Sequence, residues 1–91
     1  MRQRPKAEPN VRTLKVFSRQ GCHLCELLVE ELVPLVRGQA AVDVLDVDQD
    51  VALREQYGLR VPVVTLDGRV LCEYHLDRQA VEEALKNGTG N

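Results

Sequence analysis

The stretch Gln20-Gly21-Cys22-His23-Leu24-Cys25-Glu26-Leu27-Leu28 places two thiols three residues apart, where an apolar helical pattern begins just after a short strand-like run. If Cys22 and Cys25 share the first turn of a helix, they lie on one face and are close enough to form a disulfide. Cys22 would then also lie at a helix N-terminus, where the dipole and the unpaired N–H groups favour a thiolate and lower the thiol pKa. The stretch therefore predicts redox thiol chemistry.

Composition narrows the class of protein. The chain has 91 residues, of which 44% are apolar, and it contains one Phe and no Trp, so we expect one small domain with an aliphatic core. The net charge of -2 and the lack of a basic stripe argue against nucleic-acid binding. The apolar runs are too short to span a bilayer, so no membrane association is expected.

The ends of the chain and the cysteine count indicate the compartment. Residues 1–11 are basic and contain proline but lack the apolar core of a secretory signal, so we expect a disordered tail there. Residues 12–88 are predicted to form the domain and residues 89–91 to fray. Three cysteines do not suggest a secreted disulfide framework, which favours a cytoplasmic protein. We expect it to be a monomer.

The first half of the domain alternates strands with helices. A strand is expected over Thr13–Ser18, and a helix begins at Cys22. Pro34 should kink or end that helix, with Gly38 as its outer limit. A second strand covers Ala41–Val47. Asp48 or Asp50 can then cap a short helix over Val51–Tyr57 that Gly58 ends.

The second half predicts a hairpin and a last helix. Val61–Leu66 is apolar enough for a central strand, and Asp67-Gly68 is a two-residue hairpin signal before a fourth strand from Arg69 to about Glu73. Asp77 caps the last helix, which Gly88 ends. The order is β-α-β-α-β-β-α, in which the first crossover makes a right-handed parallel pair.

Three segments together resemble the glutaredoxin-like family of the thioredoxin-fold superfamily, in particular its bacterial Cys-His-Leu-Cys type. They are the strand, turn and cysteine pair around residues 19–25, Asp46-Val47-Asp48 with the helix and loop over residues 53–60, and Val61-Pro62-Val63-Val64. The likeness runs from about Thr13 to Lys86. It implies an α/β, thioredoxin-like fold whose four-stranded mixed sheet, of order 2-1-3-4, is flanked by helices.

The resemblance also implies a site. Cys22 would be the exposed nucleophile and Cys25 the more buried resolving thiol. Pro62 would be cis and lie beside the thiols, and the Val61 backbone would pair with the substrate. Arg19 and Asp77 would approach the same site. His23 has two open interpretations: a solvent-facing residue, or an imidazolium that stabilises the Cys22 thiolate.

Two departures from the family concern glutathione. The glycine pair that typical glutaredoxins carry before the last helix, where glutathione docks, is replaced here by Glu73-Tyr74-His75-Leu76. The basic residue that usually follows the second cysteine is replaced by Glu26, although Arg19 keeps a cation before Cys22. We therefore expect glutathione to be a poor partner.

The leading functional hypothesis is a thiol–disulfide oxidoreductase that needs no cofactor beyond its Cys22–Cys25 disulfide. Its substrate would be a disulfide-containing protein or a small thiol compound, and its reductant glutathione or thioredoxin reductase. The alternatives are an iron–sulfur cluster carrier and a metal-binding module that use the same cysteines. Cys72 is interpreted as a packed strand residue that alternates with Val70 and Tyr74, with a third redox or zinc-ligating thiol as the alternative.

Overall fold

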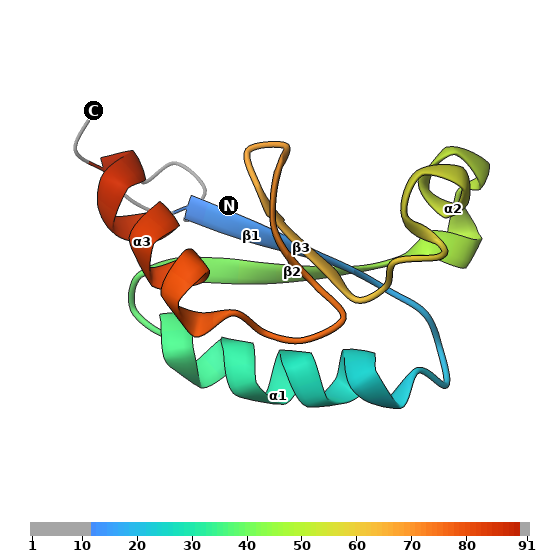
Figure 1. Cartoon of the computed structure of the whole chain (residues 1–91), viewed down its shortest axis with the longest axis horizontal. Coiled ribbons are helices and arrows are strands. Elements are labelled where there is room, and N and C mark those ends of the chain that lie inside the picture. The colour runs from blue at the N-terminus through green and yellow to red at the C-terminus, as the bar shows by residue number, and fades with distance from the viewer. Residues whose placement is uncertain (1–11, 90–91) are drawn as a thin grey trace, which may run out of the picture.

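The computed structural model describes residues 12–89, and the predicted tail over residues 1–11 and the last two residues lie outside this range. Its elements follow the predicted order, with one additional 3₁₀ turn, η2, before α2 (Figure 1). They are β1 (Arg12–Ser18), α1 (His23–Val36), β2 (Ala40–Asp46), η2 (Val47–Gln49), α2 (Val51–Tyr57), β3 (Val63–Leu66), β4 (Arg69–Glu73) and α3 (Arg78–Thr89).

The predicted strand order 2-1-3-4 is confirmed, and the strand directions determine which loops meet. β1 is parallel to β2 and antiparallel to β3, and β3 is antiparallel to β4. Phe17 near the end of β1 therefore lies opposite Val63 at the start of β3, which in turn lies opposite Glu73 at the end of β4. The segments 19–22, 61–62 and 74–77 consequently gather at one edge of the sheet.

One face of the sheet, which we call the inner face, packs against both α1 and α3. Alternation along β1 directs Leu14 and Val16 to this face, because successive strand side chains point to opposite sides. The other core residues here are aliphatic, as expected from the composition: Leu28, Leu32, Val36, Val64, Leu66, Val81, Ala84 and Leu85. Burial of these side chains stabilises the two long helices against the sheet.

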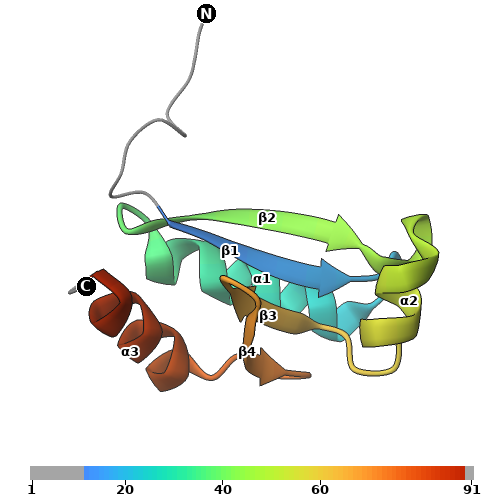
Figure 2. The same cartoon turned by 90° about the horizontal axis from the view of Figure 1, so that it is seen from above.

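The opposite face, the outer face, is covered only at one end. Phe17, Val47, Tyr57 and Val63 form a small buried cluster there, with the rings of Phe17 and Tyr57 stacked at a centroid distance of 4.1 Å. The short helix α2 supplies Tyr57. Figure 2 looks onto the outer face, with α2 beyond the tips of β1 and β2 and α1 behind the sheet. Most of the outer face is therefore left without a helix in the described part of the chain.

Several predicted boundaries differ from the observed ones. Cys22 is the extended N-cap of α1 rather than part of its first turn. Pro34 lies inside the last turn of α1, which ends two residues later at Val36. β2 begins one residue earlier than predicted and gives way to η2 at Val47, and β3 begins at Val63 rather than Val61. Within residues 12–89, no helix is both long and apolar enough to cross a membrane.

The predicted alternation of Cys72 with Val70 is wrong. A register irregularity between Val64 and Thr65 sets Cys72 opposite Val64 and Val70 opposite Thr65. Because consecutive residues of β3 face opposite sides, Cys72 and Val70 do as well. Cys72 thus packs on the inner core, while Val70 is exposed on the outer side.

Candidate functional site

The two thiols lie at the start of α1 and are disulfide-bonded, with their Cα atoms 5.2 Å apart. The turn that leads into the helix is closed by the Cys22 N–H, which donates to the Arg19 carbonyl at 3.2 Å. Gly21 adopts a φ of 77°, a left-handed conformation that glycine accepts without strain. Cys22 Sγ accepts a hydrogen bond of 3.1 Å from the Cys25 N–H, so the first thiol is the side-chain cap of the helix.

The two sulfurs differ in accessibility. Cys22 is partly exposed, whereas Cys25 is only 3% exposed. Cys25 lies below a largely apolar hollow of about 330 Å³ between α1 and the edge strand β2, which is also lined by Ser18, Arg19, Glu26, Val29, Glu30 and Val44. A reagent from solution therefore meets Cys22 more readily than Cys25, and an anion on Cys22 faces the positive end of the helix dipole.

Arg19 braces the loop that precedes the thiols. Its Nε and Nη2 donate to the two carboxylate oxygens of Asp48 at 2.8 and 3.1 Å, and its Nη1 donates to the Gly58 carbonyl at 3.1 Å. The hydrogen bond to Arg19 lowers the pKa of Asp48 and raises the pKa of Arg19. The guanidinium thus ties β1 to η2 and to the end of α2, and its charge is already paired.

The loop that carries Val61 and Pro62 accepts hydrogen bonds from the neighbouring segment after β4. The Val61–Pro62 peptide bond is cis, Val61 is half-buried and Pro62 is buried. The Tyr74 N–H donates to the Pro62 carbonyl at 2.8 Å, and the Tyr74 hydroxyl donates to the Leu59 carbonyl at 3.1 Å. Tyr74 has a φ of 69°, in the left-handed region that is uncommon outside glycine.

An apolar rim lies between α1 and the segment after β4. Leu24 and Leu27 on α1 are 38% and 41% exposed, and Tyr74 across from them is 44% exposed. Together with Leu28, Glu31, His75 and Leu76 they line a hollow of about 140 Å³. Exposed apolar side chains clustered beside a reactive group are typical of a surface that contacts another molecule.

The other predicted site residues lie at the same edge of the sheet but differ in exposure and in their hydrogen-bond partners. His23 is exposed, with Nδ1 4.0 Å from Glu26 Oε1. Asp77 is exposed and caps α3 through a 3.0 Å hydrogen bond from the Ala80 N–H. Cys72 is half-buried against the inner core, and burial raises the pKa of its thiol. Residues 12–89 contain no group of three His, Cys, Asp or Glu side chains arranged to hold a metal ion.

Some of the contacts that fix this site are not predicted from the sequence. Asp48 and Asp50 are both predicted as possible caps of α2, and Asp50 is the one that caps it, accepting from the N–H groups of Ala52 and Leu53. A signal for the true role of Asp48 was present, because Arg19 and Asp48 each follow a strand of a parallel pair and such strand ends meet at one edge. The roles of the Gly58 and Leu59 carbonyls depend on loop geometry and have no sequence signal.

Comparisons with known proteins agree with the fold. Residues 13–86 match the family described as "Glutaredoxin-like domain (DUF836)". An uncharacterized protein of Mycobacterium tuberculosis is 30% identical over 83 residues, which cover 84% of each chain. The solution structure of a Nitrosomonas europaea protein is similar with 33% identity and a TM-score of 0.71, over 79% of this chain and 88% of that chain. A mutant thioredoxin of Halobacterium salinarum is 31% identical with a TM-score of 0.59, over 82% and 72%.

Proposed function

Because the chain belongs to the glutaredoxin-like domain family (DUF836), we propose that it is a thiol–disulfide oxidoreductase in which Cys22 attacks and Cys25 resolves. One observation carries the proposal: a partly exposed thiol caps α1 and is bonded to a thiol that is only 3% exposed. A thiolate at a helix N-terminus has a lowered pKa, and a buried thiol keeps a higher one. This difference in thiol pKa favours attack on the substrate by Cys22, with Cys25 attacking second.

The proposed reaction is a thiol–disulfide exchange that needs only the sulfurs of Cys22 and Cys25 and a substrate disulfide. The Cys22 thiolate attacks one sulfur of a substrate disulfide, so that the substrate S–S bond breaks, a mixed disulfide forms and the first substrate thiolate leaves and takes up a proton. Cys25 loses its proton and attacks Cys22 Sγ, which releases the second substrate thiol and leaves the Cys22–Cys25 disulfide. Two electrons pass to the substrate, and an external thiol reductant returns them.

We propose a disulfide-containing protein as the substrate rather than a glutathione mixed disulfide. The apolar rim of Leu24, Leu27 and Tyr74 offers non-polar contact area beside Cys22. In typical glutaredoxins a glycine pair lets glutathione approach the start of the last helix, whereas here Tyr74 occupies that stretch and its hydroxyl donates a hydrogen bond to the Leu59 carbonyl on the facing loop. The Arg19 guanidinium, already bonded to Asp48, is not free to bind a glutathione carboxylate.

We also propose the source of the electrons, the cellular compartment and the residues that contact the substrate. The two sulfurs suffice for the chemistry, so no prosthetic group is invoked. Thioredoxin reductase or glutathione would return the electrons, in the reducing cytoplasm that the cysteine usage favours. His23, Val61 and Asp77 are proposed to contact the substrate, since all three lie at the edge of the sheet that carries Cys22.

The test is steady-state reduction of a peptide disulfide, run in parallel with thioredoxin reductase and with glutathione plus its reductase. We expect turnover with at least one reductant that disappears in Cys22→Ser and persists in Cys72→Ser. Equal turnover in the wild type and in Cys22→Ser would refute the proposed function. Stoichiometric iron or zinc in the purified protein, with thiols that do not react, would favour the metal-binding alternatives.

A further inference from the structure

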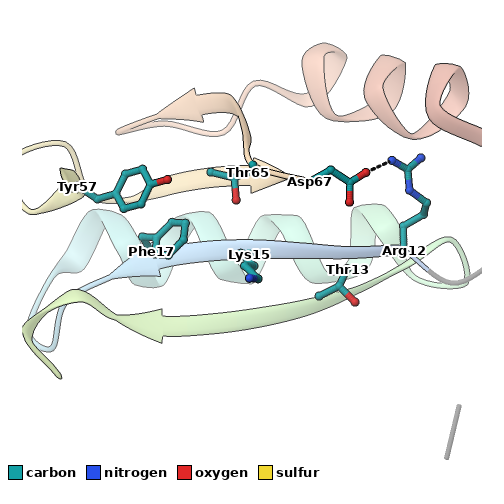
Figure 3. A pocket seen from close by; sticks show the side chains of 8 residues that line it. Arg12, Thr13, Lys15, Phe17, Tyr57, Thr65 and Asp67 are labelled. Atoms are coloured by element: carbon teal, nitrogen blue, oxygen red, sulfur yellow. Dashed lines mark hydrogen bonds and ion pairs between the residues drawn. The ribbon is translucent and has the colours of Figure 1, made fainter. Parts of the chain in front are cut away.

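The outer face of the sheet carries a further cavity, distinct from the thiol site. Its volume is about 480 Å³, and it extends along β1 and β3 on the side opposite α1 and α3 (Figure 3). It is lined by Arg12, Thr13, Lys15, Phe17, Tyr57, Thr65, Asp67 and Gly68. Because α2 covers only the end of this face, the cavity lies over the part of the sheet that has no helix in the described range.

The charges in this outer cavity do not cancel. Arg12 at one end is paired with Asp67, with Nη2 2.6 Å from Oδ2, while Nη1 of the same guanidinium is buried and has no hydrogen-bond partner. Lys15, in the middle of the wall, is exposed and has no ion-pair or hydrogen-bond partner for its ammonium within residues 12–89. Asp43 is the register neighbour of Lys15 on β2 but forms no ion pair with it. The lining therefore has a net charge of +1.

The uncharged lining is amphipathic. Thr65 on β3, opposite Lys15, and Thr13 on β1 contribute hydroxyl groups, and the Tyr57 hydroxyl points along the face toward Thr65 (Figure 3). The stacked rings of Phe17 and Tyr57 close the other end with apolar surface. A site that combines one unpaired cation, several hydroxyl donors and an aromatic end wall suits a small molecule with an oxyanion and a planar apolar part.

We propose that the outer cavity binds a small organic oxyanion, a carboxylate or a phosphate monoester, whose charged group lies on Lys15 and whose apolar part contacts the Phe17–Tyr57 end. The charge pattern favours this occupant over the chain's own N-terminal segment. Residues 1–10 contain Arg2, Arg4 and Lys6 against a single Glu8, so that segment repels Lys15. This site is independent of the thiol chemistry.

The test is an amide NMR titration of the full chain with phenyl phosphate, benzoate and inorganic phosphate as separate probes. We expect saturable shifts in residues 12–17, 57 and 65–68 at concentrations up to about 10 mM, and tighter binding of phenyl phosphate than of inorganic phosphate. Binding of phenyl phosphate alone would identify a phosphate site, and binding of benzoate as well would identify a general oxyanion site.

Two charge variants move the affinity in opposite directions. Lys15→Gln should weaken binding about tenfold, and Asp43→Asn should tighten it about threefold, because each removes one charge near the anion. Arg78→Gln is the matched control: it removes one positive charge at the start of α3, which packs on the inner face, and should leave the affinity unchanged.

Three results would overturn the proposal. They are the absence of saturable shifts in the outer cavity, equal losses in Lys15→Gln and Arg78→Gln, and shifts that depend on protein concentration rather than on the probe. Equal affinity for inorganic phosphate and phenyl phosphate would refute the role of the aromatic end wall. A Lys15→Gln chain that fails to fold would leave Asp43→Asn to decide, since an unchanged affinity there also contradicts the charge argument.

Discussion

Cys22 and Cys72 both precede a helix, but their surroundings make them chemically different. Cys22 caps α1, accepts the Cys25 N–H and has a partner thiol with its Cα 5.2 Å away. Cys72 lies on β4 and packs against the inner core, where burial raises its pKa more than a backbone N–H of Asp77 lowers it. A position ahead of a helix is therefore not enough to make a thiol reactive; capping geometry, access and a partner thiol are also needed.

The largest difference between Cys22 and Cys72 is expected in the turnover rate of their serine variants. Cys22→Ser should reduce disulfide reduction to the uncatalysed rate, because no other thiol combines access with a helix cap. Cys72→Ser should retain at least about half of the wild-type rate, since Cys72 takes no part in the proposed exchange. The measurement is reduction of a peptide disulfide with a regenerated reductant. A loss of activity in Cys72→Ser as large as in Cys22→Ser would break the comparison.

The next contrast is in reactivity toward an alkylating agent after reduction of the disulfide. At pH 7 we expect Cys22 to react at least about tenfold faster than Cys72, because each unit of pKa separation changes the thiolate population about tenfold. The raised pKa of Cys72 keeps it protonated at this pH, and its rate should still rise with pH beyond the range of an ordinary thiol. Mass mapping of labelled peptides checks this, and faster labelling of Cys72 would contradict it.

The segment after β4, which follows Cys72 and faces α1, is proposed to influence the choice of substrate. Tyr74→Gly removes the ring beside Leu24 and Leu27 and suits a φ of 69°, so we expect the rate with a glutathione mixed disulfide to rise about fivefold. Tyr74→Phe is the matched control: it loses only the hydroxyl bonded to Leu59 and should stay near the wild-type rate. A fall in the rate for Tyr74→Gly, in chains with normal circular dichroism, would remove the steric argument.

Cys72 is expected to matter for stability rather than for turnover. Cys72→Ser places a hydroxyl against the inner core and should lower the free energy of unfolding by about 1 kcal/mol. Cys72→Ala, which keeps an apolar group, should cost less. Urea unfolding of the reduced proteins measures both changes, and a serine variant as stable as the wild type would show that the thiol is not packed.

The smallest effect is expected at the ion pair between Arg19 and Asp48, next to the loop that precedes Cys22. Because the folded-state pKa of Asp48 is lowered, the carboxylate contributes stability at pH values above its unfolded-state pKa. That contribution is lost as the pH falls below about 4 and through the folded-state pKa. Asp48→Asn should therefore be slightly less stable than the wild type at pH 7, with the difference shrinking in acid. Urea unfolding at several pH values checks this, and a difference that grows in acid would contradict it.

Much of the fold could be predicted because local signals agreed with one another. The strand-like run over Thr13–Ser18, the Asp67-Gly68 turn and the Asp77 cap each predict the element that is observed. The family resemblance then supplied the strand order, which local signals do not determine. The start of α1 was one residue off because a cysteine can cap a helix with its sulfur, a role that propensity assigns to Ser, Thr, Asp or Asn.

The details of the site were harder to predict because they depend on contacts between distant segments. The register irregularity between Val64 and Thr65 changes the face of the sheet on which Cys72 lies, and no residue of that hairpin indicates it in the sequence. The hydroxyl of Tyr74 reaches a carbonyl fifteen residues away in sequence. Arg19 and Asp48 are separated by 29 residues and meet only because β1 and β2 are parallel neighbours.

The most direct test of the account is to trap the mixed disulfide. A Cys25→Ser, Cys72→Ser chain that retains only Cys22 is incubated with an oxidised peptide disulfide and analysed by intact mass and peptide mapping. We predict one peptide adduct, on Cys22, released by added dithiol. The matched Cys22→Ser, Cys72→Ser chain, which retains only the buried Cys25, should form little adduct. Equal or faster adduct formation on Cys25 would contradict the assigned order of attack.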